Sequence, residues 1–459
     1  MICTRSLSLA LAVALGSVAS LAHADDLIQI YGEARQSDPA LAGAEATRDA
    51  TNENIVQARS ALLPQIGASL AYQQAHGSTA GPEVVTNDDG SETLLDFGYD
   101  SYGRTLTGRL DQSIFDLSRW ADLSTAKSTG QAGDANYHAA EQDLLLRVAT
   151  AYFEVLSAED TLVFDKSNEE ALARQLEQAQ QRFEVGLSAI TDVNDAKAQH
   201  DSAVANVIVS QNTVEDTKEA LRQLTNRQPG DLKKLREKLP LDRPNPEDPE
   251  AWVATALEMN PNLDSLAYQL DAANSNINSA RSGHLPTLSG SLVYSDMPTW
   301  SDNDATRISD PFHANSERWS TSVGLSLNVP IYSGGYTSSR VRQSIHNRDY
   351  AQDLFEERKR LVERNIRNSY RAVFAGVSEV EATGQAVLSA QSSLDATQAG
   401  YEVGTRTIVD VLISQRQLLS AQSSYSLARH RFVLNGLRLK TAAGTIQVSD
   451  LEAVNTLLE

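Results

Sequence analysis

Cysteine is nearly absent from this sequence. The 459 residues include one, Cys3, which lies in an N-terminal stretch (residues 1–24) with one arginine, a short apolar run and the ending Ala-His-Ala. These features predict a secretory signal peptide that is cleaved before Asp25. A retained signal anchor is disfavoured because the apolar run is short for a membrane span. The mature chain then has no thiol, which excludes a disulfide, a cysteine nucleophile and a cysteine-bound metal.

Long hydrophobic runs are also missing. After the signal peptide no stretch approaches the roughly 18 consecutive apolar residues of a membrane-spanning helix. Aromatic residues make up only 6% of the chain and hydrophobic residues 41%, a composition that favours long helices with narrow apolar seams over thick cores. Two classes remain open: a soluble exported protein, or an outer-membrane barrel whose strands are too weakly hydrophobic to register as spans.

Positive charge and catalytic motifs are scarce. Lys and Arg number 39 against 60 Asp and Glu, for a net charge of −21, which argues against nucleic acid as a partner and against simple electrostatic docking on anionic lipid. The histidines are scattered, with no paired metal-binding spacing, and there is no glycine-rich phosphate loop and no Gly-x-Ser-x-Gly motif. The sequence therefore predicts no enzyme, no catalytic residue, no cofactor and no metal site.

What the chain does contain is an internal repeat. SDPALAGAEATRDA (37–50) matches MNPNLDSLAYQLDA (259–272), and LLPQIGASLAY (62–72) matches HLPTLSGSLVY (284–294). A tandem duplication follows, in which each copy has the order helix, strand, strand, long helix, helix. The predicted parts are a signal peptide (1–24), a first repeat (25–226), a linker rich in proline and charge (227–248), a second repeat (249–444) and a C-terminal tail (445–459).

Alternating apolar residues predict two strands in each repeat. They cover 66–72 and 106–114, then 288–294 and 319–331, with polar loops between them (73–103 and 295–317) that we expect on the outer side. Strand lengths come near the roughly 9 to 11 residues that a tilted strand needs to cross a bilayer, and several strands have aromatic ends typical of membrane interfaces. An ordinary amphipathic sheet packed on another layer is the alternative.

Four strands cannot close a barrel, and an open sheet edge is not tolerated in hydrocarbon. Several chains must therefore contribute strands if the sheet lies in a membrane. Two chains would give eight strands with an interior filled by side chains, whereas three chains would give twelve strands around a lumen.

Proline-free stretches predict two long helices, at 118–185 and 335–403. Shorter helices are expected at 27–62, 188–226, 249–284 and 406–443, and the last has apolar residues at the seven-residue steps of a coiled coil. The phrases FEVGLSAITDV (183–193) and YEVGTRTIVDV (401–411) fall where a long helix meets a short one. We expect Gly186 and Gly404 to end one helix, and Thr191, Asp192 or Thr407 to serve the start of the next. A helix-glycine-helix turn without further function is the alternative.

The sequence closely resembles the TolC family of trimeric outer-membrane export channels over essentially the whole mature chain. The resemblance rests on the signal peptide, the tandem repeat of strands and helices, and the two glycine-centred segments at 183–193 and 401–411. The resemblance implies an α+β membrane protein: a trimeric, twelve-stranded transmembrane β-barrel, four strands per chain, that continues into a long α-helical coiled-coil barrel. An equatorial collar would lie near the linker and tail. The implied location is the outer membrane of a Gram-negative bacterium, spanning into the periplasm.

The resemblance also implies a function and partners. The chain would be a homotrimeric passive channel in outer-membrane lipid, the exit duct of tripartite efflux or type I secretion systems. A periplasmic adaptor (membrane fusion) protein and an inner-membrane pump or ABC exporter would open its periplasmic tip. The alternative is a non-conducting, periplasm-spanning coiled-coil tether or a surface adhesin.

Residue roles follow from the same resemblance. At the periplasmic gate, Tyr401 and Arg406 would bond to Thr191 and Asp192. Asp410 would form an acidic selectivity ring under threefold symmetry. Ile413 stands where the family carries a second acid, which leaves one ring and weakens the expectation of strong block by multivalent cations. The implied adaptor-binding residues are Val185, Gly186, Leu187, Val403, Gly404 and Thr405.

Overall fold

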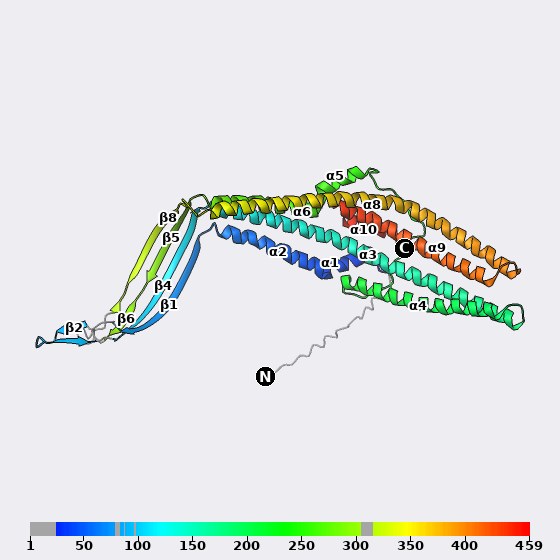
Figure 1. Cartoon of the computed structure of the whole chain (residues 1–459), viewed down its shortest axis with the longest axis horizontal. Helices are drawn as coiled ribbons and strands as arrows, with labels where there is room; N and C mark the ends of the chain where they lie inside the picture. Colours follow the sequence, from blue (N-terminus) through cyan, green and yellow to red (C-terminus); the bar gives the residue numbers. More distant parts are fainter. Residues whose placement is uncertain (1–23, 79–82, 87, 96–97, 304–314) are drawn as a thin grey trace, which may run out of the picture. The chain divides into compact units, whose positions relative to one another are not determined.

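The computed structural model describes residues 24–78, 83–86, 88–95, 98–303 and 315–459 (Figure 1). The predicted signal peptide lies outside these residues except for Ala24. The elements in chain order are α1 (Leu27–Ser37), α2 (Pro39–Ser60), β1 (Gln65–Ser78), β2 (Glu83–Thr86), β3 (Glu92–Leu95), β4 (Gly98–Phe115), α3 (Leu117–Glu184), α4 (Ile190–Thr225), α5 (Pro249–Met259), α6 (Pro261–Ser282), β5 (Thr287–Asp296), β6 (Thr299–Asn303), β7 (Asn315–Ser316), β8 (Trp319–Asn328), α8 (Tyr336–Glu402), α9 (Ile408–Ala443) and α10 (Val448–Asn455).

The long helices confirm the prediction from the proline-free stretches. α3 has 68 residues and α8 has 67, and each is followed by a helix of 36 residues, α4 or α9. In the described part of the chain, no helix combines the length and the apolar character that crossing a membrane requires.

The predicted helices at 27–62 and 249–284 are wrong in one respect, because each is two helices. α2 and α6 begin at Pro39 and Pro261, and the residues before them have extended backbone, with ψ of 115° at Asp38 and 112° at Asn260. Proline lacks the amide hydrogen and clashes with the preceding turn, so a helix cannot run through it without a kink or break. Asp38 and Asn260 also accept hydrogen bonds from the first turn of the new helix, from the backbone N–H of Leu41 (3.1 Å) and of Asn262 (3.0 Å).

The contacts divide the chain into two compact units. One contains the described residues up to Leu41, Glu141–Trp252 and Ile366–Glu459, and the other contains Ala42–Ala140 and Val253–Asn365. Each unit combines segments from both sequence repeats, and α3 and α8 contribute to both units. The two sequence repeats are therefore interleaved between the units.

The sheet lies in the second unit and is antiparallel throughout. β4 pairs with β1 on one side and with β5 on the other, and β8 pairs with β5; these four strands run side by side in Figure 1. The short strand β6 also pairs with the start of β4, and β7 pairs with β6. Within the described residues β1 and β8 are hydrogen-bonded on one side only, so the sheet has two open edges.

The predicted loops were too long. β1 continues to Ser78, β4 begins at Gly98, and β2 and β3 form a small hairpin inside the first loop. Similarly β6 and β7 lie inside the second loop, and β8 ends at Asn328 rather than at 331. The extensions of β1 and β4 are polar on both faces, so the alternation of apolar and polar residues that marks a strand is absent from them.

The two faces of the sheet differ in chemistry, as the alternation predicts. Register places Ile66, Leu110, Leu292 and Val323 in one row across the four strands. Ile66 and Val323 are each 81% exposed, so this apolar face is uncovered in the single chain. The opposite face carries mainly serine and threonine, and we call it the hydroxyl face.

The first unit is packed around the middle of α3. Tyr152 and Phe153 are fully buried there, and the Tyr152 hydroxyl donates a hydrogen bond of 2.8 Å to the carbonyl of Lys233 in the segment between α4 and α5. The backbone N–H of Asp25 donates to the carbonyl of Asp231 at 2.7 Å. The start of the described chain and this connecting segment are thereby fixed to the helices of the unit.

Candidate functional site: the two helical tips

Two turns with the same glycine geometry join α3 to α4 and α8 to α9. Gly186 has φ +75° and Gly404 has φ +80°, a left-handed conformation that other residues adopt only with strain. The N–H of the residue after each glycine donates back into the helix, from Leu187 to the Arg182 carbonyl and from Thr405 to the Gly400 carbonyl, both at 2.8 Å. This is the glycine-terminated helix end expected from the sequence.

The two following helices begin differently. Thr407 is the N-cap of α9, and its hydroxyl accepts a hydrogen bond from the N–H of Asp410 at 3.2 Å. The N-cap of α4 is Ala189, which has no capping side chain. The expectation for Thr407 is confirmed, whereas Thr191 and Asp192 do not cap α4 because both already lie within its first turn.

The carboxylate of Asp410 completes a capping box. Its Oδ2 accepts hydrogen bonds from the backbone N–H and from the hydroxyl of Thr407, each at 2.9 Å. These two bonds, together with the nearby positive charge of Arg406, hold the pKa of Asp410 below its ordinary value. Asp410 is therefore an ionised carboxylate fixed at the start of α9.

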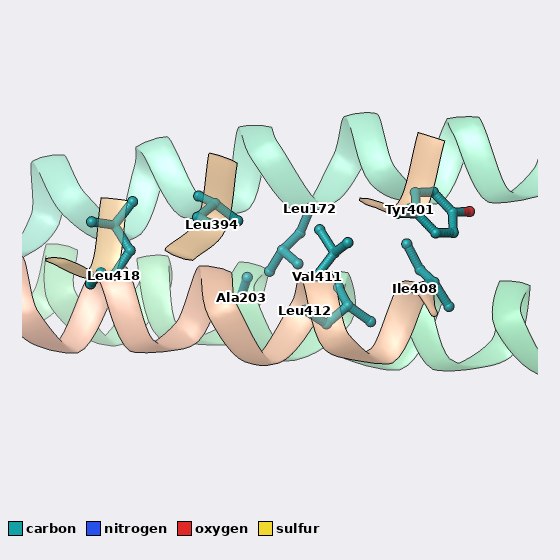
Figure 2. Close-up of a cluster of buried hydrophobic side chains, with 9 residues drawn as sticks. Leu172, Ala203, Leu394, Tyr401, Ile408, Val411, Leu412 and Leu418 are labelled. Atoms are coloured by element: carbon teal, nitrogen blue, oxygen red, sulfur yellow. The ribbon is translucent and has the colours of Figure 1, made fainter. Parts of the chain in front are cut away.

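The second tip lies at one end of an apolar cluster (Figure 2). Tyr401 is 7% exposed and Ile408 2% exposed, while their counterparts in the first tip, Phe183 and Ile190, are 42% and 51% exposed. The cluster joins four helices and consists of Leu172, Ala203, Ala390, Leu394, Tyr401, Ile408, Val411, Leu412 and Leu418.

Tyr401 has a buried ring and a hydroxyl that lacks a partner. The guanidinium of Arg182 lies 4.8 Å from the ring centroid, a distance that suits a cation–π contact. Figure 2 shows the hydroxyl oxygen pointing away from the other labelled side chains, and this oxygen is buried with no hydrogen-bond partner among the described residues. Leaving a buried hydroxyl unsatisfied costs about 1–3 kcal/mol.

The four predicted gate residues are not bonded to one another within the chain. Thr191 and Arg406 are exposed and Asp192 is half-exposed. In the part of the chain that the structure describes, no hydrogen bond or ion pair joins Tyr401 or Arg406 to Thr191 or Asp192. Behind the tips the following helices are joined by other residues, since Arg416 of α9 donates a hydrogen bond of 2.8 Å to the Gln199 side chain of α4.

The predicted adaptor-binding residues form exposed shoulders on both tips. Val185, Leu187 and Val403 are large apolar residues with well-exposed side chains. The Thr405 hydroxyl donates to the Gly400 carbonyl at 3.0 Å and so helps to fix the second turn. An exposed apolar group beside a hydrogen-bonded turn is a suitable contact for another protein.

Sequence reasoning missed two contacts at this site. The contact of Arg182 with Tyr401 joins α3 to α8, and the sequence has no local signal for it. The capping box was visible as a Thr-x-x-acid pattern over 407–410, but Asp410 was assigned only to a selectivity ring. No group of three or more His, Cys, Asp or Glu side chains that could hold a metal ion occurs among the residues described.

Comparison with known proteins places this chain among outer-membrane channels. The outer membrane efflux protein family matches residues 30–227 and 252–445. The chain is 38% identical to outer membrane protein TolC of Escherichia coli (strain K12), over 99% of this chain and 89% of that protein. It is 27% identical to the alkaline protease secretion protein AprF of Pseudomonas aeruginosa, over 94% of this chain and 87% of that protein.

Solved structures show the same fold. The outer membrane protein VceC of Vibrio cholerae has a TM-score of 0.72 at 19% identity, covering 91% of this chain and 96% of VceC. The open state of the Neisseria gonorrhoeae MtrE outer membrane channel has a TM-score of 0.69 at 19% identity, covering 92% of this chain and 91% of MtrE. By sequence and fold together, this chain belongs to the outer membrane efflux protein family.

Proposed function

We propose that three copies of this chain form a passive, gated export duct that an adaptor and an inner-membrane pump open at its helical tips. Members of its family are outer-membrane channel proteins of Gram-negative bacteria, with roles in efflux and secretion. Beyond this role of the family, we propose the trimer, the passive mechanism, the gate residues and the partners.

The observation that carries the proposal is the uncovered apolar face of the sheet. Ile66, Leu70, Val323 and Leu325 project into open space from β1 and β8, which a water-soluble sheet avoids. In hydrocarbon such a face is stable, but open strand edges are not, because their backbone groups find no partner. The edge of β1 in one chain would therefore pair with the edge of β8 in the next.

The number of chains follows from the strand count. Two chains would supply eight main strands, whose interior would be filled by side chains, whereas three would supply twelve and leave a lumen. The hydroxyl face would line that lumen, since serine and threonine hydroxyls form hydrogen bonds with water. Three chains are the smallest number that leaves a passage.

We infer that the gate bonds form between neighbouring chains. The buried hydroxyl of Tyr401 has no partner within the described chain, and Arg406 is exposed at the same tip. Thr191 and Asp192 of the adjacent copy would supply a hydroxyl and a carboxylate. An Arg-carboxylate pair is charge-assisted and directional, yet at an exposed tip an adaptor can replace its bonds.

The adaptor would recognise the shoulders of both tips, at Val185–Leu187 and Val403–Thr405. Both turns are fixed by backbone hydrogen bonds back to their helices, from Leu187 to Arg182 and from Thr405 to Gly400, and these bonds help to hold the apolar side chains beside them in place. Relatives are named for protease secretion and for efflux, and we propose both classes of cargo. The pump would supply the energy, and the duct would supply the exit.

Asp410 would form one acidic ring inside the narrow end of the trimer. Its capping bonds fix the carboxylate and keep it ionised, so three copies would attract cations. Ile413 is 55% exposed where a second ring would lie, which predicts weaker block by multivalent cations than a double ring would give.

Planar-bilayer recording of the purified protein tests the proposal and separates a duct from a non-conducting tether or adhesin. We expect a small conductance from the wild type and a severalfold rise when Tyr401→Phe and Arg406→Ser are combined. Arg416→Ser is the matched control, because it removes a cation near the same tip whose hydrogen bond lies within the chain. No conductance from either the wild type or the double variant would contradict the duct.

A further inference from the structure

The hydroxyl face of the sheet is almost free of charge. Within 65–73, 105–113, 287–295 and 319–328, its hydroxyl residues, by register, are Ser69 on β1, Thr105, Thr107 and Ser113 on β4, Thr287, Ser289, Ser291 and Ser295 on β5, and Ser320, Ser322 and Ser326 on β8. Within 65–73, 105–113, 287–295 and 319–328, the ionisable side chains on this face are Arg109 and Asp111.

Arg109 and Asp111 form a pair on one strand. The Arg109 Nε donates to Asp111 Oδ2 at 2.5 Å, and the side chains are 60% and 44% exposed. The pair projects from β4, a central strand, rather than from an edge that another chain would cover. It is therefore open to the space in front of the hydroxyl face.

The neighbouring strands do not compete for either charge. Across the register Arg109 lies opposite Gly67 on β1 and Val293 on β5, and neither side chain can accept a hydrogen bond. Asp111 lies opposite Gln65 and Ser291, which are both uncharged. Among the residues opposite them in register, Arg109 and Asp111 therefore have no charged neighbour. Each is the charged partner of the other.

We propose that Arg109 and Asp111 form the charged level of the membrane part of the duct, a self-neutralised pair that lets ions and cargo of either sign pass. The proposal rests on the proposed function, which places the hydroxyl face toward the lumen. Three copies would put three positive and three negative groups at one level with no net charge. Losing one member would leave three like charges around the passage, which would concentrate ions of the opposite sign.

Cysteine labelling tests both the face and the pair. The one native cysteine, Cys3, lies in the predicted signal peptide, so a single introduced thiol reports its own position. Ser291→Cys places a thiol on the hydroxyl face opposite Asp111, and Leu292→Cys places one on the apolar face. The full-length trimer in lipid vesicles is treated with a negatively charged methanethiosulfonate (sulfonatoethyl) or a positively charged one (trimethylammonium-ethyl), and the two labelling rates are compared.

The expected result is a change in the ratio of the two rates at Ser291→Cys. Adding Asp111→Asn should raise the anionic-to-cationic ratio by about tenfold, and adding Arg109→Gln should lower it by about tenfold, because a focused potential changes local reagent concentration. Reversing the pair (Arg109→Asp with Asp111→Arg) should return the ratio to the wild-type value. The reversed pair also shows whether both positions tolerate substitution in a folded trimer.

Asp100→Asn is the matched control. It removes the same charge from the same strand, but Asp100 lies on the opposite face and bonds to His76, so the ratio should not change. Ratios within about twofold of wild type in both single-charge variants, with Ser291→Cys still labelled, would overturn the role of the pair alone. Labelling of Leu292→Cys without labelling of Ser291→Cys would instead overturn the membrane arrangement in the proposed function.

Discussion

The two tips share one phrase and differ in how their helices are held. Gly186 and Gly404 adopt the same backbone, but only the second tip has a capping box and buries its aromatic and isoleucine side chains. The shared residues make the turn. The residues that differ decide whether the tip is fixed by its own chain or left to contact something else.

In the proposed gate, this difference suits the two tips to different tasks. The second tip contributes Tyr401, Ile408 and Val411 to a cluster that also contains Leu172 and Ala203 of the first hairpin, so it is anchored. The first tip keeps Phe183 and Ile190 exposed, as expected for a surface that receives a neighbouring chain or a partner. A latch between one anchored and one receiving tip can open without unfolding either helix pair.

The largest expected effect is on packing at the second tip. Ile408→Ala should lower the free energy of local opening by about 2–5 kcal/mol, because it leaves a cavity in a buried cluster. Ile190→Ala, the same change at the same place in the repeat, should cost under about 0.5 kcal/mol. Hydrogen exchange of the amides at 401–412 and at 183–193 measures both. Equal costs would mean that the tips are equally anchored.

Substitution of the N-cap residues should have a smaller effect on the stability of the tips. Thr407→Ala removes the capping box of α9 and should destabilise that helix start by about 1 kcal/mol. Ala189→Thr places a threonine three residues before Asp192 and so recreates the Thr-x-x-acid pattern in α4. Amide exchange should become faster at 408–411 in Thr407→Ala and slower at 190–193 in Ala189→Thr. Unchanged exchange in both would contradict the assigned role of the cap.

The smallest expected effect is on the titration of Asp410. Its folded pKa lies below the ordinary 3.8, so the ionised carboxylate stabilises the tip above that pH, and the contribution is lost as the pH falls through the lowered pKa. Thr407→Ala should raise the pKa toward 3.8. Block of the channel by a polyvalent amine should then disappear at a higher pH than in the wild type.

A control for this titration is Thr383→Ala. The Thr383 hydroxyl bonds to carbonyls of its own helix, so its removal should leave the pH dependence of block unchanged. The same shift in both variants would mean that the capping bonds do not set the pKa of Asp410.

Local features of the fold were predictable from the sequence, and packing was not. The long helices follow from proline-free stretches and the turns from Gly186 and Gly404, because these constraints act within a few residues. The breaks before Pro39 and Pro261 were predictable by the same rule but were overlooked. The ends of β1 and β4 could not be seen, since strands with two polar faces carry no alternation.

The burial difference between the tips had no sequence signal. Phe183 and Tyr401, like Ile190 and Ile408, are similar residues in matching positions. What separates them is a shared cluster with Leu172 and Ala203, which come from distant parts of the chain. The Tyr401 hydroxyl has no hydrogen-bond partner among the described residues, which the sequence could not show. The proposed bond from this residue to a neighbouring chain agrees with that observation.

Disulfide trapping tests the central claim, that the latch joins neighbouring chains. The one native cysteine, Cys3, lies in the predicted signal peptide. Asp192→Cys and Arg406→Cys are introduced together and oxidised, with each single variant as control. The account predicts covalently linked trimers on a denaturing gel, conversion to monomers by reductant, and loss of the conductance that reductant restores. Monomers alone under oxidising conditions, with conductance unchanged, would contradict it.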